Sequence, residues 1–235
     1  DAHNYGLTTI DLSGDTGASG TNTINVSLET ETSRGFTLTG SANVDNITGG
    51  SGNDVINGGS GTTAETLIGG AGDDTFIYTS NLQLFTDAGT GVPVDAITGG
   101  DGTADAIRMD ATGGTFDIAA TDDWNGQATK ILTVEKLTAV ASTNAYTIAL
   151  HDNAYDSGLR YVDLSGDTNG TGDNIINASA ETVNSFSLFG SAGKDTITGG
   201  AGDDNIDANE GVAVITGGKG VDTIDIQESS STADT

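Results

Sequence analysis

The sequence contains no cysteine and only one proline, and lysine and arginine together number 7 against 34 aspartates and glutamates. The absence of cysteine excludes disulfides, thiolate zinc sites and cysteine nucleophiles. Apolar runs of the roughly 18 residues that span a membrane are also absent, so no membrane insertion is expected. The formal net charge of −27 repels phosphate backbones, which argues against nucleic acid as a partner, and it attracts cations.

Signals for helices and for a leader peptide are scarce as well. Of the acidic residues 27 are aspartate, which is a poor residue inside helices, so no long helix is expected. No secretory signal peptide is visible at the start, and the first residue, Asp1, predicts that the sequence is a fragment of a longer chain. A hydrophobic share of 34% with this charge is typical of disorder, but the order of the residues argues against disorder.

A long repeat divides the chain. The segment Asp11–Thr16 recurs as Asp163–Thr168, and Asp45–Gly50 recurs as Asp195–Gly200, with intervening segments that also correspond. The sequence therefore predicts three regions, namely a β-solenoid module over 1–80 with short repeats at 40–77, a divergent β connecting region over 81–150 with a partial repeat at 99–107, and a second β-solenoid module over 151–235 with short repeats at 190–225.

The short repeat has a period of nine residues. The pattern G-G-x-G-x-D starts at Gly49, Gly69, Gly199 and Gly217. With this composition about 0.1 copies are expected by chance, so the four copies are a strong signal. Glycines at the first, second and fourth positions permit a tight turn, and the apolar residue among polar neighbours that follows is typical of a short strand.

Turn and strand in alternation predict an all-β fold, a parallel β-roll or β-solenoid in which two units make one coil. Equivalent residues of successive coils would then stack about 4.8 Å apart. Asp204 and Asp222 are 18 residues apart, one complete coil, so both are expected to face the same gap between turns. Asp54 and Asp74 are 20 residues apart, with the excess in the loose region around residues 62–67.

Stacked carboxylates repel one another, and a hard divalent cation bound between them would neutralise this repulsion. Calcium takes six to eight oxygen ligands, and turns without side chains present their backbone carbonyls freely, whereas magnesium demands a rigid octahedron. The sequence therefore predicts several Ca²⁺ ions, held by sixth-position carboxylates and by the first and third residues of the complete turns: Asp54, Asp74, Asp204, Asp222, Asp45, Asp195, Gly49, Ser51, Gly69, Ala71, Gly199, Ala201, Gly217 and Lys219.

These repeats resemble the RTX (hemolysin-type) calcium-binding nonapeptide, G-G-x-G-x-D-x-U-x. The resemblance implies a parallel β-roll with calcium between successive turns and export by type I secretion. The pattern fails at Thr63 and Ala213, where the sixth position carries no carboxylate, so sites at those turns would rely on Glu65 or Glu210.

A second resemblance covers Ile131–Val140, which is similar to a Val/Ile-Glu-x-Leu element found between RTX clusters in bacterial surface-layer (S-layer) proteins and large adhesins. It implies a secreted, extracellular location at a bacterial cell surface. Strands that are rich in threonine, alanine and glycine, with almost no lysine, fit the same class.

Three functional hypotheses follow. The first is a non-enzymatic, calcium-binding structural segment of a secreted cell-surface or S-layer protein, which folds and self-associates on extracellular calcium. The second is the RTX module of an adhesin, toxin or secreted hydrolase, with a surface polysaccharide as a candidate partner. The third places an active site for polysaccharide in residues 79–154 or in the groove of the solenoid.

Overall fold

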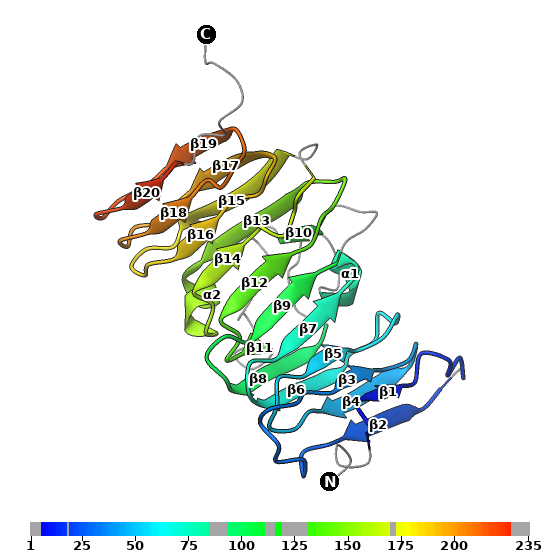
Figure 1. Cartoon of the computed structure of the whole chain (residues 1–235). Coiled ribbons are helices and arrows are strands. Elements are labelled where there is room, and N and C mark those ends of the chain that lie inside the picture. Colours follow the sequence, from blue (N-terminus) through cyan, green and yellow to red (C-terminus); the bar gives the residue numbers. More distant parts are fainter. Residues whose placement is uncertain are drawn as a thin grey trace.

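The chain winds into a two-sided solenoid of short parallel strands (Figure 1). The computed structural model describes residues 6–17, 19–84, 94–110, 116–118, 131–169 and 173–226. Except at β10 (Phe116–Ile118) and β11 (Ile131–Leu132), which both belong to shorter sheets, strands alternate along the chain between one long sheet and two shorter sheets on the opposite side, as expected for coils of two units each. The expectation of a parallel β-roll is confirmed.

One side of the solenoid is a ten-stranded parallel sheet in which the strands follow one another in chain order. Its strands are β1 (Thr9–Asp11), β3 (Thr37–Thr39), β5 (Val55–Asn57), β7 (Thr75–Tyr78), β9 (Ala106–Met109), β12 (Lys136–Ala139), β14 (Tyr161–Asp163), β16 (Ser187–Phe189), β18 (Asn205–Asp207) and β20 (Thr223–Asp225).

The opposite side consists of two five-stranded parallel sheets. The first holds β2 (Thr21–Asn25), β4 (Val44–Thr48), β6 (Thr66–Ala71), β8 (Ala96–Asp101) and β11 (Ile131–Leu132). The second holds β10 (Phe116–Ile118), β13 (Tyr146–His151), β15 (Asp173–Ala180), β17 (Lys194–Thr198) and β19 (Ala213–Thr216).

The core lies between the two sides and is built by stacking one apolar residue per strand. In the long sheet Ile56 pairs with Leu38 on one side and Phe76 on the other, and all three are fully buried. On the opposite side Ile47 pairs with Leu67, and both are buried. Because strand side chains alternate between faces, the polar neighbours of these residues point outward, as the period of two predicts.

Helices are short, as the excess of aspartate predicts. Those in the described part of the chain are α1 (Asn81–Leu84), which follows β7, and α2 (Asp152–Asp156), which follows β13. Neither is long or apolar enough to cross a membrane.

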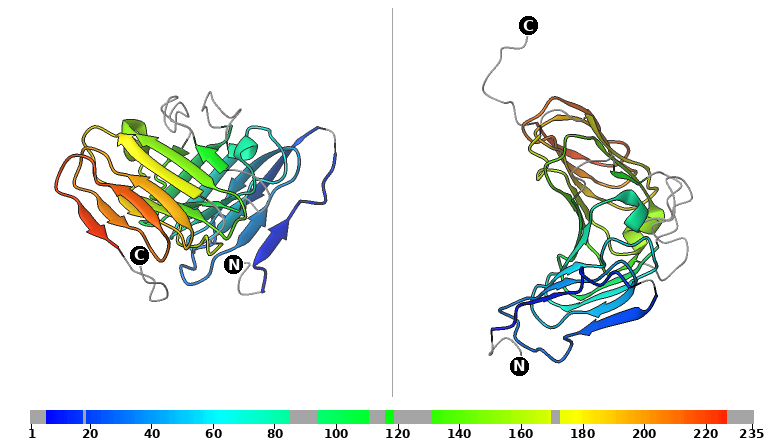
Figure 2. Two further views of the ribbon diagram at one scale, coloured as in Figure 1. Left: turned by 90° about the horizontal axis from the view of Figure 1, so that it is seen from above. Right: turned by 90° about the vertical axis from the view of Figure 1, so that its right-hand side faces the viewer.

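Strands from all three expected regions lie in the same long sheet. β9 and β12, from the 81–150 region, pair with each other and continue the sheet from β7 to β14. The coils form an elongated, bent stack with the N-terminal and C-terminal coils at opposite ends (Figure 2). The turns that join the two sides therefore line two long edges of one continuous structure.

Candidate metal centre

We name the two edges by the strands to which their turns lead. Edge A holds the turns that enter the ten-stranded sheet, and edge B holds those that enter the five-stranded sheets. The four complete G-G-x-G-x-D turns all lie on edge A, over residues 49–54, 69–74, 199–204 and 217–222. The nonapeptide turns that contain Asp45 and Asp195 lie on edge B, because these residues are in β4 and β17.

Edge A of the N-terminal half carries a ladder of four acidic residues, one in each successive coil. The Asp54 N–H donates to Asp74 Oδ1 over 2.7 Å, and the Asp74 N–H donates to Asp105 Oδ1 over 2.7 Å. The Asp105 N–H in turn donates to Glu135 Oε2 over 2.9 Å. Each carboxylate therefore binds the backbone of the equivalent residue one coil earlier, and this contact sets the spacing of the turns.

The C-terminal half repeats this arrangement on edge A. The Phe186 N–H donates to Asp204 Oδ1 over 2.8 Å, and the Asp204 N–H donates to Asp222 Oδ1 over 3.0 Å. The strands that follow these two aspartates pair in register, Asn205 with Thr223. The prediction that Asp204 and Asp222 stack at the same gap is confirmed.

Edge B carries a second ladder, in which glutamate replaces one aspartate. The Asp45 N–H donates to Glu65 Oε2, and the Glu65 N–H donates to Asp95 Oδ1 over 2.9 Å. Glu65 is 5% exposed. It lies in the turn in which Thr63 occupies the sixth position, where the sequence predicts that another acid replaces the missing aspartate. Two extra residues in this turn shift the acid from the sixth position of the motif to Glu65.

The edge B ladder of the C-terminal half is shorter. Asp195 Oδ2 accepts from the Ser191 N–H over 2.9 Å, and Asp195 pairs in register with Ala213 in the next coil. Ala213 offers no carboxylate, and Glu210 is exposed to solvent on the same turn. This turn therefore has no substitute that corresponds to Glu65.

The first glycine of each turn faces oxygen atoms from two coils. A Cβ atom on Gly49 would lie less than 3.0 Å from Asp54 Oδ2 and from the Gly69 carbonyl oxygen. One coil later, a Cβ on Gly69 would meet Asp74 Oδ2 and the Gly99 carbonyl oxygen in the same way. A carboxylate and a carbonyl thus converge beside each of these glycines, in a space that no side chain can enter.

The second half of the chain has the same pairing of oxygens. A Cβ on Gly199 would overlap Asp204 Oδ2 and the Gly217 carbonyl oxygen, and a Cβ on Gly217 would overlap Asp222 Oδ2. Carboxylate and carbonyl oxygens are the ligands that calcium prefers. The glycine positions predicted for the metal sites therefore lie beside the predicted aspartates.

The third residues of the turns hold successive turns together through their amides. The N–H groups donate to carbonyl oxygens of the preceding turn over 2.9–3.1 Å in these pairs: Ser51 to Glu29, Ala71 to Gly50, Ala201 to Glu181 and Lys219 to Gly200. The four residues thus lie at the contact between turns, where their predicted role as carbonyl ligands requires them.

Several carboxylate oxygens inside the ladders lack a hydrogen-bond partner among the described residues. Asp45 Oδ1, Asp74 Oδ2 and Asp105 Oδ2 are all buried in this way. A buried carboxylate without compensation is costly, because it has lost its hydration. The two ion pairs found among described residues, Arg108–Asp110 and Lys194–Asp173, involve none of these acids, so an added cation is the natural partner.

The pKa values of the ladder acids also indicate that these buried carboxylates lack a positively charged partner. Burial, together with the charges of Asp54, Asp105 and Asp73, raises the pKa of Asp74 to about 8. Burial likewise raises the pKa of Glu65 to about 7 and that of Asp105 to about 6. It also raises the pKa of Asp195 and Asp204. A bound cation would favour the ionised form of each acid.

Side chains alone do not complete a metal site. Within the part of the chain that the structure describes, no three His, Cys, Asp or Glu side chains gather closely enough to hold an ion. A metal at these gaps therefore needs backbone carbonyls as well as the carboxylates, and such an all-oxygen set fits calcium far better than zinc.

Several ladder acids were missing from the sequence-based list of ligands. Asp105 lies one place later in its turn than the motif requires, and Asp95 stands outside any G-G-x-G unit. Glu135 belongs to the Val-Glu-x-Leu element, between the fully buried Val134 and Leu137. The single acid between these two apolar residues was the available signal.

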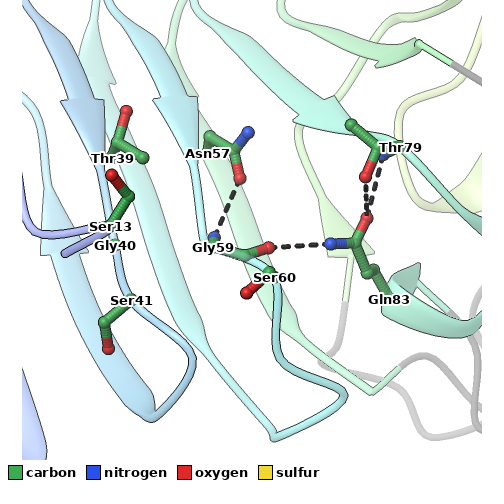
Figure 3. Close-up of a pocket in the computed structure, with 9 residues that line it drawn as sticks. All are labelled: Ser13, Thr39, Gly40, Ser41, Asn57, Gly59, Ser60, Thr79 and Gln83. Carbon is green, nitrogen blue, oxygen red and sulfur yellow. Dashed lines mark hydrogen bonds between the residues drawn. The ribbon is translucent and has the colours of Figure 1, made fainter. Parts of the chain in front are cut away.

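A polar surface pocket adjoins edge B near α1 (Figure 3). It has a volume of about 240 Å³. Gln83 lies at one end of it, where its Nε2 donates to the Gly59 carbonyl oxygen over 2.7 Å and its Oε1 accepts from the Thr79 hydroxyl over 2.8 Å. Nine residues line the pocket with hydroxyl, amide and backbone groups: Ser13, Thr39, Gly40, Ser41, Asn57, Gly59, Ser60, Thr79 and Gln83. This lining offers hydrogen bonds and contains no pair of acids.

Comparison with known families identifies the turns. The family described as RTX calcium-binding nonapeptide repeat (4 copies) matches residues 37–63, 60–77 and 187–212. This match confirms the predicted kinship of the nonapeptides over 40–77 and over 190–212, whereas the turn Gly217–Asp222 lies outside the matched residues. RTX repeats bind calcium. No curated protein and no solved structure matches the chain.

Proposed function

We propose that this chain is a structural segment of a secreted bacterial cell-surface protein that folds when extracellular calcium fills the gaps between its turns. The observation that carries the proposal is the pair of acid ladders, in which buried carboxylate oxygens such as Asp74 Oδ2 and Asp105 Oδ2 lack a partner among the described residues. Calcium binding supplies free energy only to the folded coils, because the carbonyl and carboxylate ligands converge only there.

The charge of the chain supports a switch between two compartments. In a calcium-poor cytosol a net charge of −27 and 36 glycines favour an expanded, exportable chain. Outside the cell, calcium at about 1 mM would fill loop sites with a Kd of about 10⁻⁴ to 10⁻³ M. Folding would then occur after export, at the cell surface.

Self-association into a surface assembly is the second element of the proposal. Apolar side chains with 43–80% exposure gather beside β19 and β20, the outermost strands of the described sheets. Parallel edges with apolar neighbours pair readily with further strands, from a second copy or from a continuation of the same chain. The side chains are Val212, Val214, Val221 and Ile224.

An RTX module of an adhesin, toxin or secreted hydrolase is the alternative. The hydroxyl- and amide-lined pocket around Gln83 favours it, because such a lining suits the hydroxyl groups of a polysaccharide. Ordered two-dimensional arrays in calcium under the electron microscope would support the structural role, whereas monomers that retain a glycan would support the binding module.

Far-ultraviolet circular dichroism during a calcium titration tests the folding switch, with magnesium as the control. We expect little β-structure in EDTA, a cooperative gain at calcium concentrations of about 0.1–1 mM, and a much smaller gain with magnesium. Substantial β-structure already present in EDTA at neutral pH would contradict the proposal.

A further inference from the structure

The second nonapeptide stack begins under a long loop that lacks the motif. The segment 178–186, which is the end of β15 and the six residues that join it to β16, covers the turn Gly199–Asp204 of the next coil. At the ladder position this loop carries Phe186, whose N–H donates to Asp204 Oδ1. Phenylalanine offers no carboxylate, so the gap above Asp204 lacks the acid that other gaps receive from their preceding coil.

Glu181 brings a carboxylate into the same loop from a different position. The residue is 1% exposed. Its Oε1 accepts from the N–H groups of Val183 and Asn184 over 3.2 and 3.0 Å, and from Asn184 Nδ2 over 3.0 Å. Its Oε2 is buried and has no hydrogen-bond partner in the described part of the chain. A buried carboxylate with hydrogen bonds to only one of its two oxygens would be stabilised by a bound cation.

The Glu181 side chain lies directly on the first nonapeptide turn. A Cβ on Gly200 would come within 3.0 Å of Glu181 Cβ, 3.2 Å of Glu181 Cγ and 3.1 Å of the Ala178 carbonyl oxygen. The Gly200 N–H donates to Asp204 Oδ2 over 2.7 Å. Glu181, the Ala178 carbonyl and the Asp204 carboxylate thus surround one glycine, and neither of the two ion pairs among the described residues involves Glu181 or Asp204.

The N-terminal half places a glutamate in the same way. The Ser51 N–H donates to the Glu29 carbonyl oxygen over 3.0 Å, as the Ala201 N–H does to that of Glu181. Glu29 Cβ lies 3.3 Å from the position of a Cβ on Gly50, the counterpart of Gly200. Both stacks therefore start beneath a loop glutamate, although the two loops differ in length.

We propose that Glu181 is a carboxylate ligand of a calcium ion held between loop 178–186 and the turn Gly199–Asp204, where it replaces the ladder acid that Phe186 cannot supply. This site closes the N-terminal end of the second ladder with a residue outside the nonapeptide motif. The inference rests on the proposed function, because it requires that the turns bind calcium.

The test counts calcium ions bound per chain by equilibrium dialysis of the whole chain, with circular dichroism as the measure of folding. The variant Glu181→Gln keeps the side-chain volume and the acceptor oxygen for Val183 and Asn184, but it removes the charge. Glu210→Gln is the matched control, since Glu210 is an exposed glutamate in the same half of the chain.

We expect Glu181→Gln to bind one ion fewer at 1 mM calcium, or to fill its last site at a calcium concentration at least fivefold higher, while Glu210→Gln matches the parent chain. A binding isotherm of Glu181→Gln that superimposes on that of the parent overturns the inference and leaves the proposed function standing. Failure of the parent chain to bind calcium overturns both.

A second variant decides the case in which Glu181→Gln does not fold. Glu181→Asp retains the charge with a shorter reach. If Glu181 binds calcium, Glu181→Asp folds at a lower calcium concentration than Glu181→Gln, because it keeps the charge. If Glu181 only accepts hydrogen bonds from its own loop, Glu181→Gln, which keeps the acceptor oxygen and its reach, folds at the same or a lower calcium concentration than Glu181→Asp, and the inference is wrong.

Discussion

At the scale of single residues, neighbouring aspartates in one turn have opposite roles. Asp204 is buried and stacked between Phe186 and Asp222, whereas Asp203 is exposed and accepts from the Val221 N–H over 2.8 Å. Adjacent residues point to opposite sides of an extended chain. The motif G-G-x-G-x-D thus places only its sixth residue in the ladder.

This difference gives a charge-removal test. Asp204→Asn keeps an acceptor oxygen but removes the buried charge, so we expect the calcium concentration at half-folding to rise about tenfold, which corresponds to about 1.4 kcal/mol. Asp203→Asn removes the same formal charge at the surface and should shift the midpoint less than twofold. Equal shifts in a calcium titration of the two variants would argue against the assignment of Asp204.

The first glycine of a turn gives a steric test. Gly199→Ala places a methyl group against Asp204 Oδ2 and the Gly217 carbonyl oxygen, at less than 3.0 Å from each. We expect a loss of at least about 2 kcal/mol of stability at saturating calcium, measured by chemical unfolding, because backbone must move. Gly14→Ala is the control, since its Cβ would meet nothing within 4 Å, and a change of about 0.5 kcal/mol or less is expected there. Equal losses of stability in Gly199→Ala and Gly14→Ala would contradict the close approach of oxygen atoms to Gly199.

At the scale of the elements, the nine-residue period predicted the positions of Asp54, Asp74, Asp204 and Asp222, because glycines mark where each turn begins. It did not predict Asp105, since one extra residue in its turn shifts the acid relative to the glycines, or Glu135, whose turn contains no glycine, although the strand register is kept at both. Glu181 lies outside the motif altogether, and only the packing of its loop against Gly200 reveals it.

The acid ladders give a pH test on the calcium-free chain. The pKa of Asp74 is raised to about 8 and that of Glu65 to about 7, mainly by burial. A carboxyl group with a raised pKa binds its proton more tightly in the folded state, so its contribution to stability is lost as the pH rises through the folded pKa. We therefore expect β-structure in EDTA to decrease between pH 5 and pH 8.5, as followed by circular dichroism.

Saturating calcium is the control for this pH test. A bound ion favours the carboxylate form, so the loss of β-structure with rising pH should disappear over the same range. A calcium-free chain that gains β-structure as the pH rises would contradict the assignment of Asp74 and Glu65 to buried ladders.

At the scale of the whole molecule, the ten-stranded sheet connects the edge A ladder of the N-terminal half to that of the C-terminal half. The coils between the two ladders carry no acid at the ladder position. On edge A the ladder passes from Glu135 to Arg160 and then to Phe186. Arg160 donates to the carbonyl oxygens of Tyr155 and Leu159, and its guanidinium lies 3.4 Å from the centre of the Tyr155 ring. Arg160 thus fills the ladder position of this coil with a cationic side chain, so the position has no carboxylate for an added cation to neutralise.

Hydrogen exchange tests this difference. At a calcium concentration that removes half of the β-signal, we expect amides of β13 and β14 to remain protected while those of β5, β7, β18 and β20 exchange quickly, because only the latter stack on calcium-dependent turns. The measurement is peptide-resolved mass spectrometry. Uniform loss of protection along the chain would contradict a calcium-independent middle.

The most direct measurement is a crystal structure grown with ample calcium, with anomalous diffraction used to locate the ions. Calcium should appear in the gap between the turns of Asp204 and Asp222, within 2.3–2.6 Å of carboxylate and backbone carbonyl oxygens. An ordered pair of turns whose gap contains no ion, or whose two carboxylates point to solvent, would contradict calcium as the element that holds the coils together.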